Sequence, residues 1–79
     1  MATAQDFARE YELALLANVM KEPEKYRYTP EEVPKVAAKM IAAFKAGNAN
    51  TGSAMKTAAH ACGIKPTLAA VKALLNSNP

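Results

Sequence analysis

The chain has 79 residues and lacks the covalent and metal links that usually hold a small fold together. Its single cysteine, Cys62, cannot form a disulfide within the chain, and one histidine with one cysteine cannot make a four-ligand zinc site. A domain of this size buries only about 60% of its unfolded surface, so its stability depends on efficient packing. We therefore expect one domain, spanning residues 1–79, that relies on helix packing or on a partner, with a homodimer as one form of partner.

Alanine makes the α-helix the expected element. It occupies 18 of the 79 positions, and most of these follow residue 36. Alanine has the highest helix propensity, and its small side chain lets neighbouring helices approach closely. No segment reads as a β-strand. The sequence therefore predicts an all-α fold, a compact four-helix domain.

Apolar spacing and capping signals place the four helices at about 4–20, 30–46, 53–62 and 66–76. Thr3 followed by Asp6 is a capping signal for the first helix. Gly47 and Gly63 mark the ends of the second and third helices, since glycine tolerates the left-handed conformation found there. The 47–53 loop then separates an N-terminal helix pair from a C-terminal pair.

The helix starts carry more specific expectations. Thr29 and Glu32 form a capping box with Pro30 at the first helical position, while Pro34 predicts a tight first turn and regular helix from about residue 34. Pro66 is expected to start the fourth helix. Before the third helix there are three candidate capping residues: Asn50, Thr51 and Ser53.

The first helix has a wider apolar face than one neighbouring helix can cover. Its main stripe consists of Phe7, Tyr11, Ala14, Leu15 and Val19. Leu13, Leu16 and Met20 extend the stripe sideways and are candidates for a partner or dimer interface. Tyr26 and Tyr28, in the polar connection that follows, are expected to cover the core with their hydroxyls reaching water. In the fourth helix the expected buried positions are Leu68, Val71, Leu74 and Leu75.

All seven acidic residues lie within the first 32 positions. Residues 1–32 contain four bases and seven acids, a net charge of −3, whereas residues 33–79 contain six lysines and no acid, a net charge of +6. A surface of this kind attracts polyanions such as nucleic acid or an acidic protein face. None of the six cations is arginine, the residue preferred at phosphate contacts.

Residues 57–76 resemble the helix-turn-helix of small phage and bacterial repressors. The matching positions are a small residue, Ala59, four before the turn glycine Gly63, then the aliphatic Ile64, and Thr67 at the opening of the next helix. The resemblance implies DNA binding, with phosphate or polyanion contacts from Lys56, Lys65, Thr67 and Lys72. The outward face of the second helix of this motif offers few groups that read bases. The contacts would therefore position the protein on the nucleic acid more than they would select a base sequence.

The sequence predicts a binding protein and not an enzyme, because no set of residues in it could perform catalysis. His60 and Cys62 face different directions on one helix. We expect His60 to be half-exposed and Cys62 to be buried, and we expect neither to bind a metal or a cofactor. DNA binding is the first expectation. The alternative is an effector or inhibitor, of the type encoded by phages and mobile elements, that docks on a host protein through the lysine-rich face. Neither a signal peptide nor a membrane span is recognisable, which predicts a cytoplasmic location.

Overall fold

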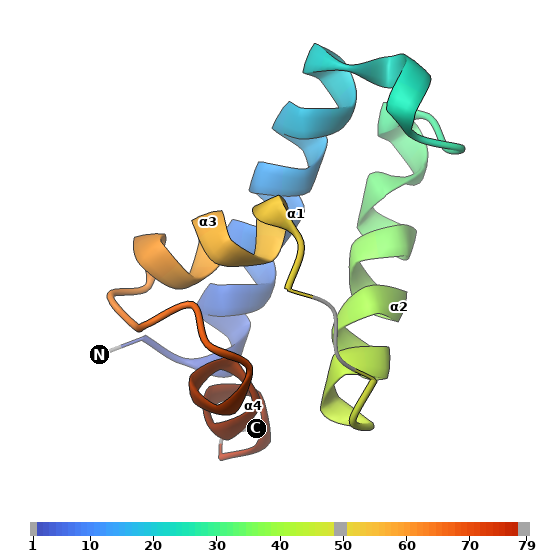
Figure 1. Ribbon diagram of the computed structural model, residues 1–79. Coiled ribbons are helices and arrows are strands. Elements are labelled where there is room, and N and C mark those ends of the chain that lie inside the picture. The colour runs from blue at the N-terminus through green and yellow to red at the C-terminus, as the bar shows by residue number, and fades with distance from the viewer. Residues whose placement is uncertain (1, 49–50, 78–79) are drawn as a thin grey trace.

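The computed structural model describes residues 2–48 and 51–77, and within these ranges it contains four α-helices and no β-strand. The predicted all-α fold is therefore confirmed. The elements in chain order are α1 (Ala4–Lys21), η1 (Pro23–Lys25), η2 (Pro30–Glu32), α2 (Val33–Lys45), α3 (Ser53–Ala61) and α4 (Leu68–Asn76). Figure 1 shows α1 and α2 running antiparallel, α3 crossing α1, and α4 beside the N-terminal end of α1.

The central helix is α1, which packs against each of the other three helices. Its buried stripe follows the predicted spacing, with Phe7, Tyr11, Leu15 and Val19 all at most 5% exposed. The contact with α3 is the most extensive one in the molecule, and α3 supplies mostly small side chains to it: Ala54, Met55, Ala58 and Ala59. The core is completed by α2 and α4, through Val33, Ala37, Phe44, Val71 and Leu75.

Both N-terminal capping signals operate as predicted. Thr3 Oγ1 accepts a hydrogen bond from the Asp6 amide at 3.1 Å, and the Asp6 carboxylate accepts one from the Thr3 amide at 3.0 Å. The Glu32 carboxylate likewise accepts from the Thr29 amide at 2.9 Å. The turn at Pro30–Glu32 is a 3-10 turn, and the α-helix proper begins at Val33. The tight first turn expected before Pro34 is therefore present.

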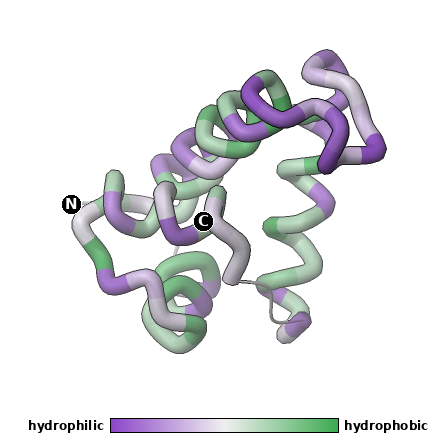
Figure 2. Tube along the Cα trace, turned by 45° about the horizontal axis from the view of Figure 1, so that its top comes forward, coloured by the Kyte–Doolittle hydropathy of each residue, from purple (hydrophilic) through white to green (hydrophobic). Residues whose placement is uncertain are grey.

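The α1–α2 connection is a largely hydrophilic stretch (Figure 2).

Both predicted glycine stops adopt the left-handed conformation, with φ of +103° at Gly47 and +72° at Gly63. After α3, the amide of Gly63 donates to the His60 carbonyl, and the amide of Ile64 donates to the Ala59 carbonyl. This is the Schellman pattern, which satisfies two carbonyls at the helix end. The same pair of bonds follows α2, from Gly47 and Asn48.

The starts of α3 and α4 differ in how far they follow the prediction. α3 begins at Ser53 as predicted, but its N-cap is Gly52, with no side-chain cap from Thr51 or Ser53; Asn50 lies outside the described residues. The fourth helix starts at Leu68 and not at Pro66, because Thr67 is the cap and its Oγ1 accepts from the Ala70 amide at 3.1 Å.

Three of the four apolar positions predicted for α4 contact the core. Val71 and Leu75 are buried, and Leu74 is half-buried. Leu68, expected in the buried stripe, is instead 39% exposed, and it is the first residue of the helix. The prediction placed the helix start on Pro66, whereas Thr67 has an extended backbone (φ −94°, ψ 152°) and the helix begins after it.

The Schellman turn after α3 gives a test of the fold. Gly63→Ala should lower the free energy of unfolding by about 1 kcal/mol, because a Cβ is disfavoured at positive φ. No atom lies within 4 Å of an added Cβ, so the cost comes from the backbone alone. Urea denaturation measures it, and Gly63→Asn serves as the control. Equal stability of Gly63→Ala and the parent chain would contradict the assignment.

Candidate binding surfaces

The four predicted polyanion-contact residues do not form one cluster. Lys56, Lys65 and Thr67 are exposed, whereas Lys72 is half-buried. Lys56 lies in the first half of α3, and Lys65 lies in the turn that follows the other end of that helix. Thr67 uses its hydroxyl oxygen to cap α4. The basic residues are therefore distributed over several faces.

Lys72 lies at the C-terminal end of α2. Its Nζ is 3.6 Å from the point where a Cβ on Gly47 would stand. A cation is favourable at a helix C-terminus, where unpaired carbonyls carry partial negative charge. The fold thus brings Lys72 to the helix end that also carries Lys45, a residue that was not among the predicted contacts. No local pattern could reveal this neighbourhood, because the two lysines belong to helices that are far apart in the sequence.

The helix-turn-helix-like segment differs from the expected arrangement. The connection between α3 and α4 covers residues 62–67, and each helix packs more on α1 than on the other. The exposed positions of α4 include Leu68, Ala69, Ala73 and Asn76, of which Asn76 alone has an amide that could read a base. The side chains that α4 turns to solvent are therefore mostly apolar.

Carboxylates lie at the start of this connection. Asp6, Arg9 and Glu10 of α1 line a shallow hollow together with Ala61 and Cys62 at the end of α3, and Arg9 pairs with Asp6 at 3.6 Å. Burial, followed by the negative charges of Glu10 and Asp6, raises the pKa of the Cys62 thiol. The acidic residues of the N-terminal half thus come close to the turn that the resemblance assigned to DNA.

Cys62 and His60 differ from their predicted exposure. Cys62 is half-buried and His60 is exposed, so each is more accessible than predicted. Among the residues that the structure describes, no three histidine, cysteine or acidic side chains come together as metal ligands would.

The sideways extension of the α1 face is exposed. Leu13 is 54% and Met20 is 66% exposed, while Leu16 between them is half-buried against the core. Residues three and seven positions apart lie on one side of a helix, so these side chains form a continuous apolar stripe. We call Leu13, Leu16 and Met20 the α1 stripe.

None of the helices in the described ranges combines the length and the hydropathy that a membrane crossing needs.

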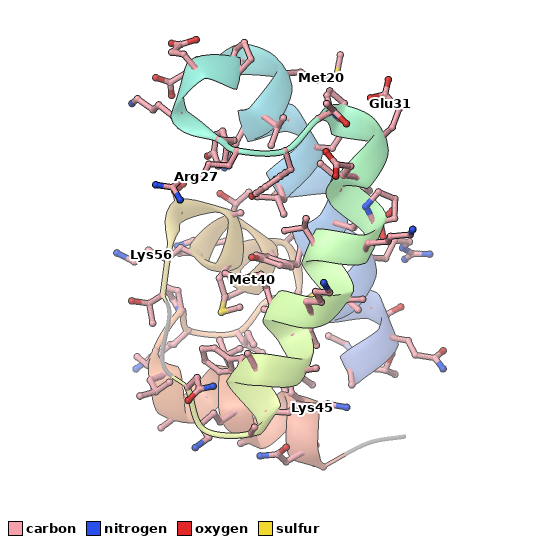
Figure 3. All side chains as sticks on the ribbon, turned by 90° about the vertical axis from the view of Figure 1, so that its right-hand side faces the viewer. Met20, Arg27, Glu31, Met40, Lys45 and Lys56 are labelled. Carbon is pink, nitrogen blue, oxygen red and sulfur yellow. The ribbon has the colours of Figure 1, made fainter. Side chains whose placement is uncertain are left out.

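A cavity of about 140 Å³ lies where α1, the α1–α2 connection, α2 and the start of α3 meet. Its apolar wall includes Leu15, Met40 and Met55, and Figure 3 shows Met40 projecting from α2 toward α3. Polar groups line the rest of it: Tyr11, Asn18, Tyr26, Tyr28 and Ser53. The sequence predicted that the two later tyrosines cover the core, but it gave no signal for a cavity beneath them.

Tyr11 is the most deeply buried of the three tyrosines, with 4% of its surface exposed. Burial is the main reason that the pKa of Tyr11 is raised to about 12, and the neighbouring Tyr28 and Tyr26 raise it further. The neutral phenol is therefore the form that the fold favours. Its stabilising effect is complete below pH 10, the ordinary pKa, and is lost as the pH rises toward 12.

We expect the free energy of unfolding to fall between about pH 10 and pH 12 as Tyr11 ionises. Tyr11→Phe, which has no ionisable group, should lose this part of the pH dependence. Urea denaturation at a series of pH values measures the effect. Tyr28→Phe is the comparison variant: it removes a neighbour that helps to raise the pKa of Tyr11, but it should keep most of the alkaline loss, because burial of Tyr11 is the main cause. The same alkaline loss in Tyr11→Phe as in the parent chain would contradict the role of Tyr11.

Comparison with protein-family models, with curated proteins and with solved structures gives no match for this chain. Its function therefore has to be inferred from its own charges, exposed side chains and cavity.

Proposed function

We propose that this chain is a small non-enzymatic binding protein that contacts nucleic acid through phosphate groups, without reading a specific sequence. The supporting observation is the position of its charges. Both salt bridges within the described ranges use bases of the acidic N-terminal half, Arg9 with Asp6 and Lys25 with Glu22. No lysine of α2, α3 or α4 forms a salt bridge among the described residues, although, after the hydrogen bonds from Thr29, the charge of Lys35 also helps to lower the pKa of Glu32.

Most of these lysines are accessible to a large partner. Five of the six are exposed: Lys35, Lys39, Lys45, Lys56 and Lys65. An ammonium group binds phosphate as a point charge, which gives affinity without base discrimination. The apolar outward face of α4 fits the same view, because it offers little for reading base edges. We therefore place the contact on the lysines of α2 and α3 and on the Lys45–Lys72 end of the molecule, and not on α4 as a recognition helix.

Binding to a fluorescent oligonucleotide, followed by anisotropy at about 50 mM and about 200 mM salt, tests this proposal. Affinity should fall steeply with salt, since each phosphate contact releases counterions. Lys45→Gln and Lys56→Gln should each weaken binding and lower the salt slope by about one. Oligonucleotides of different sequence should bind alike.

Lys25→Gln is the matched control, since it removes the same charge from the acidic half, where Lys25 Nζ lies 2.8 Å from the Glu22 carboxylate. It should leave the salt slope unchanged. A chain that does not bind the oligonucleotide at about 50 mM salt, or one whose binding responds equally to all three substitutions, would refute the proposal.

A second candidate function is protein binding, and the exposed α1 stripe favours it. An apolar contact between helices gains stability when such side chains leave water, by about 25 cal/mol per Å². The partner is either a second copy of the chain or a host protein, on which the lysines would meet an acidic surface.

For the α1 stripe we expect self-association, which light scattering measures. The paired substitution Leu13→Ser and Met20→Ser should leave a particle with the mass of one chain, 8.4 kDa. Its stability should change by only about 0.5 kcal/mol per site, because both side chains are exposed. Substitution of the exposed Ala17 by Ser is the control. If the parent protein itself has the mass of one chain, self-association through the α1 stripe is refuted, and the partner of the stripe would then be a different protein.

A further inference from the structure

We propose that the cavity at the start of α3 binds a small organic acid. The carboxylate would lie at the N-terminus of α3, and the apolar body of the ligand would lie against Leu15, Met40 and Met55. This site is independent of the lysine surface, because no lysine lines the cavity.

The first turn of α3 supplies donors for an anion. The helical hydrogen bonds begin with the Lys56 amide, which donates to the Gly52 carbonyl at 3.1 Å. The amides of Ser53, Ala54 and Met55 precede that bond, and α3 has no side-chain cap. Ser53 is exposed, whereas Ala54 and Met55 are only 6% and 3% exposed, and all three line the cavity.

The charge at this helix end is also uncompensated. The first turn of α3 contains no acidic residue. Helix N-termini carry a partial positive charge and attract anions. Two other helix starts supply a carboxylate of their own, Asp6 for α1 and Glu32 for the turn before α2, and the start of α4 is capped by the Thr67 hydroxyl. The sequence on either side of the α3 start contains no acidic residue, so a bound carboxylate would bring the negative charge that a helix N-terminus favours.

A second and independent observation is the Tyr11 hydroxyl. The Tyr11 side chain is 96% buried, as its 4% exposure implies, and no hydrogen bond joins its hydroxyl to another described residue. No side-chain oxygen in the described ranges is both sealed from solvent and unpaired. The hydroxyl of Tyr11 must therefore open into the cavity that this residue lines. A buried hydroxyl that faces a cavity can donate a hydrogen bond to an acceptor on a ligand or to a water molecule there.

Size and charge narrow the ligand class. An apolar cavity of about 150 Å³ accommodates benzene, so the 140 Å³ available here suits a single ring or a short branched chain. No charged side chain lines the cavity, which disfavours a dianion such as a phosphate monoester and gives no partner to a cation. A monoanion with a compact apolar body satisfies both the helix end and the wall of leucine and methionine.

Sodium benzoate is the probe for the test, with benzyl alcohol as the uncharged analogue and sodium acetate as the anion without a ring. In titrations of the ¹⁵N-labelled chain followed by NMR, benzoate should cause saturable shifts of the Ser53, Ala54 and Met55 amides. Its affinity should exceed that of either analogue by at least about fivefold. Tyr11→Phe should weaken benzoate binding by about tenfold while retaining the fold.

A second variant tests the amide contact. Ser53→Pro removes one donor at the first helical position, where proline is well tolerated, and should also weaken benzoate binding. Leu68→Pro is its matched control, since it makes the same change at the first position of α4, outside the cavity. No saturable shift in the first turn of α3, equal affinity for benzoate and benzyl alcohol, or unchanged binding by Tyr11→Phe would each overturn the proposal.

Discussion

The packing of α3 across α1 is the contact on which the rest of the structure depends. Ala58 and Ala59 are completely buried, and their small side chains let α3 lie close to α1. A core without disulfide or metal needs such close contact, since tight packing is then its main source of stability. The same crossing directs the N-terminus of α3 at the tyrosines and leaves its other end beside Asp6 and Glu10.

Because α3 crosses α1, the distribution of charge over the surface differs from the distribution of charge along the sequence. The acid-free half of the sequence does not form an acid-free half of the molecule, because the end of α3 lies next to two carboxylates of α1. Exposed lysines without a salt bridge lie on α2 and α3, and Lys72 lies at the C-terminal end of α2. The proposed contact with a polyanion is therefore placed on these regions and not on the turn that resembles a helix-turn-helix.

The helices and much of their packing could be predicted from the sequence. The caps and turns at the helix ends depend on hydrogen bonds between residues three to five positions apart, so a short stretch of sequence is enough to predict them. This holds for the capping residues Thr3, Asp6 and Thr29 and for the glycines at 47 and 63. The start of α4 was misplaced because Pro66 and Thr67 are both plausible start signals. With Thr67 as the cap, Leu68 is the first residue of the helix instead of the third.

The sequence by itself determined the four helices, the apolar stripe of α1 and the charge asymmetry, because each follows from residue type and periodicity. The tertiary structure alone decided that Lys72 lies at the end of α2, that Asp6 and Glu10 lie at the end of α3, and that Tyr11 opens into a cavity. These neighbours come from different helices, and their meeting depends on the angle at which α3 crosses α1. That angle follows from the fit of whole helix surfaces, which no local pattern records.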